Sequence, residues 1–275
     1  MISFSDILKA GFDFILPHTC IICSEELERG MICDNCLEYL PLVNPPLCPA
    51  CGRPAANAAH CTFCRDRDAL DHGRAWMLFV PPSDAVIHHF KYRRKTRLAH
   101  LLGRAMAGIV KADFVLSQSD VVASIPLFWL KKIRRGYNQS AILAQIISTE
   151  TGIEHRDLLK RIRNTRTQTR LSEEHRRQNV LNAFAVCGDG VQDKKILLID
   201  DVLTTGATLK ECYRVLKQAG AAEVYSCVAA ITPDRSHAPS RHRPATSLRH
   251  RPACLSASGG TGRSRQVNLR PGFPG

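Results

Sequence analysis

The sequence predicts an α/β fold, a mostly parallel sheet with flanking helices, preceded by a small cysteine-rich module. Two observations predict it. From residue 73 onward, segments with a strand pattern alternate with segments of helical spacing, which is typical of parallel sheets. Eight of the twelve cysteines lie between residues 20 and 64, where aliphatic residues are few. The 275 residues suffice for one α/β domain and one such module.

Residues 1–17 are expected to form an amphipathic helix. Their apolar residues fall on one helical face, and Asp6, Lys9 and Asp13 interrupt the apolar run. Because no basic segment precedes it, this stretch does not have the pattern of a secretion signal. We expect the helix to pack on its own protein rather than on a membrane surface. No stretch of the chain reaches the roughly eighteen apolar residues of a transmembrane helix.

The region 18–70 is expected to be a double zinc ribbon. Its cysteines form four CxxC pairs, and the second half repeats the first at a constant offset of 28 residues. Two CxxC turns supply four thiolates, the ligand set of a closed, structural zinc site. With so few aliphatic residues, metal binding would supply most of the folding free energy. The ligands of two Zn²⁺ ions would be Cys20, Cys23, Cys33, Cys36, Cys48, Cys51, Cys61 and Cys64.

Two features of these cysteines bear on compartment and pairing. A disulfide framework would need an oxidising compartment, and no secretion signal is evident, so a cytoplasmic protein is expected. Sequential pairing of the CxxC turns follows the repeat. Pairing of the first turn with the third is also geometrically possible, and the sequence leaves both open.

The remaining elements are expected in residues 73–233. Strands are predicted at 74–80, 120–126, 196–199 and 222–231. Helices are predicted at 83–112 and 138–152, and after the loop that follows residue 203, up to Gly220. Cys187, Cys212 and Cys227 fall within this domain and are expected to be core residues.

The stretch 194–212, "KKILLIDDVLTTGATLKEC", carries the strongest functional signal. Ligands in α/β sheets bind beyond the carboxyl ends of strands, where the N–H groups of the next helix attract anions. Hydroxyl groups in the loop would donate to a phosphate, while two adjacent acids would repel it and need a sugar diol or a metal ion. Phosphate and diol on one turn predict a ribose 5-phosphate ligand. The binding candidates are Asp200, Asp201, Thr204, Thr205, Gly206, Ala207 and Thr208.

An ordinary helix cap is the alternative explanation of this turn. A cap needs one polar residue, whereas this turn has five. We therefore favour the ligand site.

This stretch resembles the phosphoribosyl pyrophosphate (PRPP) loop of type I phosphoribosyltransferases. The segments "HHFKYRRK", "IRRGYNQ" and "QTRLSEEHRRQN" precede it, in the order seen in the ComF family of competence and GntX-like proteins. The resemblance covers roughly residues 8–232. It implies a type I phosphoribosyltransferase-like domain after the zinc ribbon, with Ala123 and Ser124 standing where the family usually has Val-Pro.

The resemblance also implies roles for single residues. Asp200 and Asp201 would hold the ribose hydroxyls, together with Mg²⁺ that accompanies PRPP, and residues 204–208 would cradle the 5-phosphate. Arg135 would join the two acids as a catalytic candidate by stabilising the departing pyrophosphate. Candidates for a closing loop or for nucleic-acid contacts are Lys91, Tyr92, Lys132, Arg134, Arg135, Tyr137, Asn138, Gln139, Gln168, Arg176 and Asn179.

Residues 234–275 are expected to be a disordered basic tail. They are poor in aliphatics and carry eight arginines against one aspartate, which accounts for more than half of the net charge of +13. A nucleic-acid-binding arm is one interpretation. A frameshifted end that replaces a short native terminus is the other, and we favour it.

Two functions follow from these observations together with what the family resemblance implies. In the first, the protein binds PRPP or a related ligand and acts in DNA uptake for transformation, or in DNA utilisation, through single-stranded DNA. A helicase-like protein and DNA-uptake machinery would then be partners, and these would bring a cytoplasmic protein to the membrane. In the second, it is an active phosphoribosyltransferase with an unidentified acceptor. The sequence does not choose between turnover and binding, nor does it give the oligomeric state.

Overall fold

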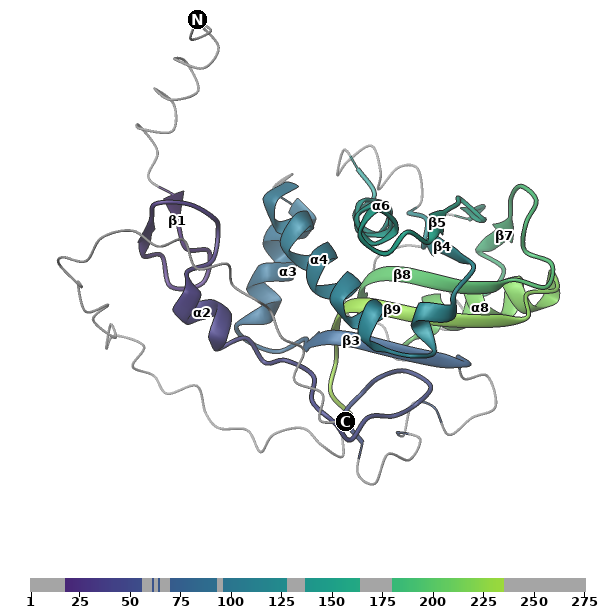
Figure 1. Cartoon of the computed structure of the whole chain (residues 1–275), viewed down its shortest axis with the longest axis horizontal. Coiled ribbons are helices and arrows are strands. Elements are labelled where there is room, and N and C mark those ends of the chain that lie inside the picture. Colours follow the sequence, from purple (N-terminus) through teal and green to yellow (C-terminus); the bar gives the residue numbers. More distant parts are fainter. Residues whose placement is uncertain are drawn as a thin grey trace, which may run out of the picture.

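The structure is a computed structural model that describes residues 18–55, 61, 64, 70–92, 96–127, 137–163 and 180–234 (Figure 1). The predicted helix at 1–17 and the predicted tail beyond Asp234 lie outside the described residues. No helix within the described ranges is both long and apolar enough to cross a bilayer.

A five-stranded parallel sheet forms the centre of the α/β domain (Figure 1). Its strand order is β3-β9-β8-β4-β5, and every neighbouring pair runs parallel. The predicted α/β class is confirmed, and so are the four predicted strands. The two-residue strand β5 was not predicted, because two residues show no period. The strands are β3 (His72–Leu78), β4 (Val121–Ser124), β5 (Glu154–His155), β8 (Lys195–Leu203) and β9 (Glu223–Ile231).

Helices cover both faces of this sheet. On one face lie α3 (Ser83–Tyr92), α4 (Thr96–Ala112) and α6 (Gln139–Thr151), and on the other lies α8 (Ala207–Gln218). Strand β8 is apolar on consecutive residues because each face meets a helical layer. Ile196 and Leu198 pack with the α8 layer, and Leu197 and Ile199 pack with the α4 layer.

The prediction of one helix over residues 83–112 was wrong, because the structure has two, α3 and α4. Residues 93–95, which separate the two helices in the sequence, lie outside the described residues. A separate antiparallel pair, β6 (Leu159–Arg161) and β7 (Phe184–Val186), flanks the sheet.

The cysteine-rich module joins the domain at strand β3. It contains β1 (His18–Thr19), β2 (Glu26–Leu27) and α2 (Asp34–Glu38). After α2 the chain runs along β3: Leu78 N–H donates to Pro41 O (2.7 Å) and Val43 N–H donates to Trp76 O (3.0 Å). The first half of the module packs with the α3 and α4 layer and the second half with the α8 layer (Figure 1). The module therefore packs against both faces of the sheet at its β3 edge.

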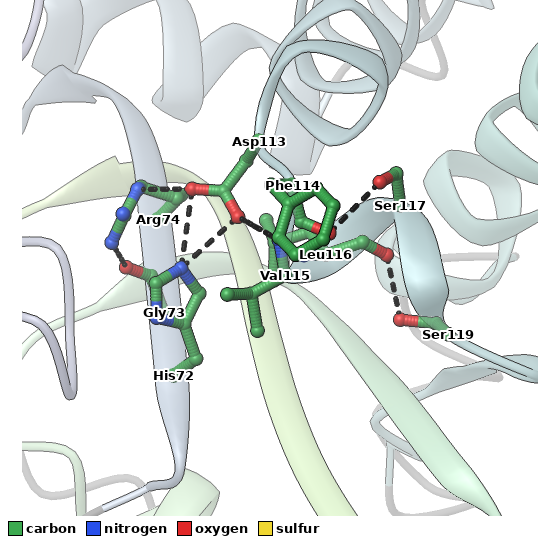
Figure 2. Close-up of polar contacts among 9 residues, drawn as sticks. All are labelled: His72, Gly73, Arg74, Asp113, Phe114, Val115, Leu116, Ser117 and Ser119. Carbon is green, nitrogen blue, oxygen red and sulfur yellow. Dashed lines mark hydrogen bonds and ion pairs between the residues drawn. The ribbon is translucent and has the colours of Figure 1, made fainter.

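A charged cluster fixes the opposite end of β3. Figure 2 shows the carboxylate of Asp113, directly after α4, between His72 and Arg74. Arg74 Nε lies 2.7 Å from Asp113 Oδ2, and His72 Nε2 lies 3.1 Å from both carboxylate oxygens. Val115 and Leu116 N–H groups donate to Oδ1 (both 3.0 Å). Burial opposes ionisation, but the hydrogen bonds and the Arg74 charge outweigh it and lower the pKa of Asp113 to about 2.

Candidate functional site

Asp200 and Asp201 lie within β8 rather than after it, because β8 extends to Leu203. The sequence placed the strand end at Ile199, where the apolar run stops. Strand pairing with β9 continues beyond that residue, as Asp200 pairs with Val228 and Leu203 with Ile231. The two acids therefore sit on a rigid central strand, close to its carboxyl end.

The two carboxylates have different partners. Ser140 Oγ, from the first turn of α6, donates to Asp200 Oδ1 (2.8 Å), as does the Asp201 N–H (2.9 Å). Lys91 Nζ, from the last turn of α3, lies 3.2 Å from Asp201 Oδ2. Burial and the neighbouring Asp201 charge raise the pKa of Asp200, and the hydrogen bonds and Lys91 only partly offset them. A cation beside such a carboxyl pair would stabilise its ionised form, because the cation relieves the repulsion.

The loop after β8 ends at the open N-terminus of α8. Gly206 precedes the helix with a φ of +77°, which other residues rarely adopt, and no side chain caps the helix. The Lys210 N–H donates to Gly206 O (2.8 Å), so the N–H groups of Ala207, Thr208 and Leu209 precede the first intrahelical bond. Such groups bind anions. The Thr204 side chain is exposed beside them.

The start of the loop is held by two residues that the sequence did not suggest. Arg53 Nη2 donates to the Thr204 carbonyl, and Thr232 Oγ1 donates to the same oxygen (3.1 Å). Arg53 belongs to the cysteine-rich module and is 151 residues away in the chain. The available signal was its place next to a CxxC pair, which is too general to indicate a contact with this loop.

Three neighbouring residues of the "RGYNQ" segment fix the elements around the site. The Tyr137 hydroxyl donates to the Phe90 carbonyl, Gln139 Nε2 donates to Lys91 O (3.1 Å), and Asn138 Nδ2 donates to Ile125 O (3.2 Å). The first two bonds anchor the end of α3 that carries Lys91. The sequence offered these residues as closing-loop or nucleic-acid contacts, and the structure shows them bound to backbone carbonyls.

The other candidates lie outside the described residues: the Tyr92 side chain, Lys132, Arg134, Arg135, Gln168, Arg176 and Asn179. Of the predicted site, the structure therefore brings together the two acids, residues 204–208 and Lys91.

The cysteine-rich module contains two clusters of four sulfur atoms. One is made by Cys20, Cys23, Cys33 and Cys36, the other by Cys48, Cys51, Cys61 and Cys64. Within each cluster all four sulfurs lie within 4.8 Å of one another. The pairing is thus sequential along the repeat.

The sulfur geometry fits zinc. Four sulfurs at about 2.3 Å from one ion in a tetrahedron lie about 3.8 Å apart. Cys23 Sγ and Cys33 Sγ are 3.8 Å apart, and Cys51 Sγ and Cys61 Sγ are 3.5 Å apart. In the first cluster the Cys33 N–H donates to Cys20 Sγ (3.5 Å), which favours a thiolate. Four-thiolate sites leave no open coordination position, so these ions are structural.

Comparisons with known proteins match both parts of the chain. Residues 11–65 match the double zinc ribbon domain family, and residues 88–247 match the phosphoribosyl transferase domain family. "Competence protein F" of Haemophilus influenzae is 30% identical over 215 residues, which cover 74% of this chain and 93% of that protein. "DNA utilization protein YhgH" of Escherichia coli strain K12 is 32% identical over 222 residues, with 76% and 95% covered.

Likeness to solved structures is weaker. The glutamine PRPP amidotransferase from B. subtilis, complexed with ADP and GMP, matches with a TM-score of 0.37 and 20% identity. The match covers 52% of this chain and 30% of that one. The fold assignment therefore depends on the sheet order and the two family matches.

Proposed function

The chain belongs to the ComF family, in which a double zinc ribbon precedes a phosphoribosyltransferase-like domain, and from this premise we propose that it binds PRPP or a related phosphoribosyl ligand at the carboxyl end of β8. One observation carries the proposal. The carboxylates of Asp200 and Asp201 and the uncapped N-terminus of α8 lie on the same strand–loop–helix unit. The two carboxylates suit a ribose diol, and the helix N-terminus suits a phosphate.

Mg²⁺ is expected to bind with this ligand. Carboxylate oxygens are the protein ligands that Mg²⁺ prefers, and Asp200 and Asp201 supply them here. Bound Mg²⁺ would neutralise charge on the pyrophosphate. Lys91 would then give up part of its contact with Asp201, because the cation and the ammonium group compete for the same carboxylate.

Isothermal titration of the full chain with PRPP, with and without Mg²⁺, tests this proposal. We expect Mg²⁺-dependent binding that weakens at least tenfold in Asp201→Asn, a loss of about 1.4 kcal/mol. The matched control is Asp157→Asn, because the Asp157 side chain is 81% exposed and lies outside the site. Absence of binding to the unaltered chain, or equal affinity in Asp201→Asn, would contradict the proposal.

A role in DNA uptake or DNA utilisation is proposed from the relatives. Their names, competence protein F and DNA utilization protein YhgH, concern these processes, and they match over about three quarters of this chain. We propose that single-stranded DNA is the nucleic acid handled, in a cytoplasmic protein that works with helicase-like and DNA-uptake proteins. Lys91 pairs with Asp201 and the Tyr137 hydroxyl donates to the Phe90 carbonyl, so we expect most of the phosphate contacts from basic residues elsewhere in the chain.

Fluorescence anisotropy with labelled single-stranded DNA tests this role. The full chain and a chain ending at Asp234 would be compared at several salt concentrations, with and without PRPP. We expect binding by both chains that weakens steeply with salt, because phosphate contacts release counterions. Binding only by the full chain would assign it to residues 235–275, and a flat salt response would contradict phosphate recognition.

Turnover is the second candidate, and it is measured separately. Release of pyrophosphate from PRPP in the presence of nucleobases or amines would show an active phosphoribosyltransferase. The ligand site is shared by both candidates, since the same acids and loop would hold PRPP during transfer. Binding without release across the acceptors tested would favour a ligand-sensing role.

A further inference from the structure

The two halves of the zinc ribbon contain the same turn with different side chains. In residues 20–25 and in residues 48–53, the first cysteine N–H donates to the carbonyl of the last residue, at 2.7 Å in both turns. That last residue is Glu25 in the first turn and Arg53 in the second. Glu25 is exposed, whereas Arg53 is 1% exposed and among the largest fully buried side chains. The side chain at this position is therefore buried in one copy of the turn and exposed in the other.

Arg53 connects the second sulfur cluster to the loop after β8. Its Nη1 donates to Cys51 Sγ (3.3 Å), its Nε donates to Thr232 O (2.9 Å), and its Nη2 donates to Thr204 O. One planar guanidinium thus touches a zinc ligand and the first residue of the proposed phosphate-binding loop. The rigid fork of arginine fixes the relative positions of these partners.

Charge explains why the guanidinium stays buried beside the sulfur cluster. Arginine keeps its proton in proteins, and a buried charge is stable only when it is paired and hydrogen-bonded. Four thiolates around one Zn²⁺ carry a net charge of about −2. The zinc-bound form of the second cluster would therefore supply a negative charge beside the Arg53 guanidinium, which donates to Cys51 Sγ.

The turn that carries Arg53 is itself fixed on the sheet. The Gly73 N–H, on β3, donates to Pro49 O (3.1 Å). Gly52 has a φ of +75°, and a Cβ added there would lie 2.7 Å from the Arg74 Cα, closer than real atoms approach. The turn thus rests directly on the β3 backbone, and its position determines that of the Arg53 guanidinium.

We propose that Arg53 is a positioning residue for the phosphate-binding loop, and that the second zinc site holds Arg53 in turn. The Thr204 carbonyl is fixed from the zinc side, which keeps the loop in its ligand-binding form before the ligand arrives. Loss of the ion from the second site then weakens ligand binding although no cysteine touches the ligand. This inference rests on the proposed PRPP site.

Amide hydrogen exchange of the ligand-free full chain tests the positioning directly. We expect peptides covering residues 203–213, in which hydrogen-bonded amides of α8 begin with the Lys210 N–H, to exchange on the order of tenfold faster in Arg53→Gln than in the unaltered chain. Arg53→Lys should restore part of the protection, because it keeps the charge and one donor. The matched control is Glu25→Gln, the same position of the first turn, which should leave loop exchange unchanged.

Zinc is removed from one site at a time by Cys64→Ser and by Cys36→Ser, which are 28 residues apart and equivalent in the repeat. These two positions are chosen because the Arg53 guanidinium donates to a different cysteine, Cys51. We expect Cys64→Ser to speed loop exchange and Cys36→Ser to change it much less. Zinc content and far-ultraviolet circular dichroism show whether each variant remains folded.

PRPP titration of the same variants separates this inference from the proposed function. Arg53→Gln should bind PRPP about tenfold more weakly, while Glu25→Gln binds normally. If the unaltered chain binds no PRPP, the proposed function fails. If it binds and Arg53→Gln binds equally well, or if loop exchange in folded Arg53→Gln is unchanged, the positioning role is overturned while the proposed function stands.

Discussion

Lys91 Nζ lies 3.2 Å from Asp201 Oδ2, so the last turn of α3 is tied to the carboxyl end of the central strand β8. The Lys91 backbone carbonyl is held in addition by Gln139 Nε2. A basic side chain from one helix is thus fixed against the acidic pair that we assign to the ligand.

Replacing Lys91 by Met is expected to destabilise the fold. The side chains of Lys91 and Asp201 are 24% and 11% exposed. Removing the Lys91 ammonium group therefore leaves the largely buried pair of Asp200 and Asp201 without this positive charge. We expect a loss of roughly 2 kcal/mol in the free energy of unfolding, less than the ~3–5 kcal/mol of fully buried pairs. Urea unfolding measures it. Lys160→Met, at an exposed position of β6, is the control and should change little.

The raised pKa of Asp200 predicts a pH-dependent effect of Asp200→Asn. The folded state holds this proton more tightly than the unfolded state, so ionisation of Asp200 destabilises the fold as pH rises from about 4 towards 7. Asp200→Asn removes that effect. Between pH 5 and pH 8, the free energy of unfolding of the variant should rise relative to that of the unaltered chain by on the order of 2 kcal/mol. Urea unfolding at each pH measures this difference. A difference that is constant with pH would contradict the raised pKa.

The lowered pKa of Asp113 predicts the opposite dependence. Its ionised form is stabilised in the folded state, so its contribution is present above pH 4 and is lost as pH falls through about 2. Asp113→Asn should lower the free energy of unfolding by about 2 kcal/mol at pH 7, and by progressively less towards pH 2. Thermal unfolding across this range measures the difference. An unchanged melting temperature at pH 7 would show that the contacts with His72 and Arg74 contribute little.

Zinc removal should unfold the ribbon before the α/β domain. The two sulfur clusters predict two ions per chain, and few aliphatic residues are available to hold the module without them. Metal analysis should give two zinc ions, and chelation should make residues 18–70 sensitive to protease while the sheet keeps its circular dichroism. Fewer than two ions, or a protease-resistant ribbon after chelation, would contradict this reading.

Local sequence patterns predicted the elements that carry the site. The apolar run from Ile196 to Ile199, the acids and the glycine-containing turn lie in one continuous segment, so periodicity and turn chemistry sufficed to place them. The zinc sites were equally accessible, because the 28-residue repeat is visible in the spacing of the cysteines.

Contacts between distant segments could not be predicted in this way. Arg53 and Thr204 are 151 residues apart, and the Tyr137 hydroxyl meets a carbonyl 47 residues away. Their partners are backbone carbonyls, which every residue possesses, so no residue type at the far end marks the contact. The same holds for the end of β8, where pairing with β9 rather than apolar residues continues the strand past Ile199.

The most direct test of the central claim locates the ligand on the loop. Backbone amide shifts of the isotope-labelled full chain would be followed by NMR during titration with PRPP and Mg²⁺. We predict that the largest shifts fall on residues 204–209, because the open N–H groups of Ala207, Thr208 and Leu209 lie at the proposed phosphate site. We also predict that Asp201→Asn abolishes these shifts at the same PRPP concentration. Absence of shifts, or shifts confined to other segments, would contradict a phosphoribosyl ligand at the carboxyl end of β8.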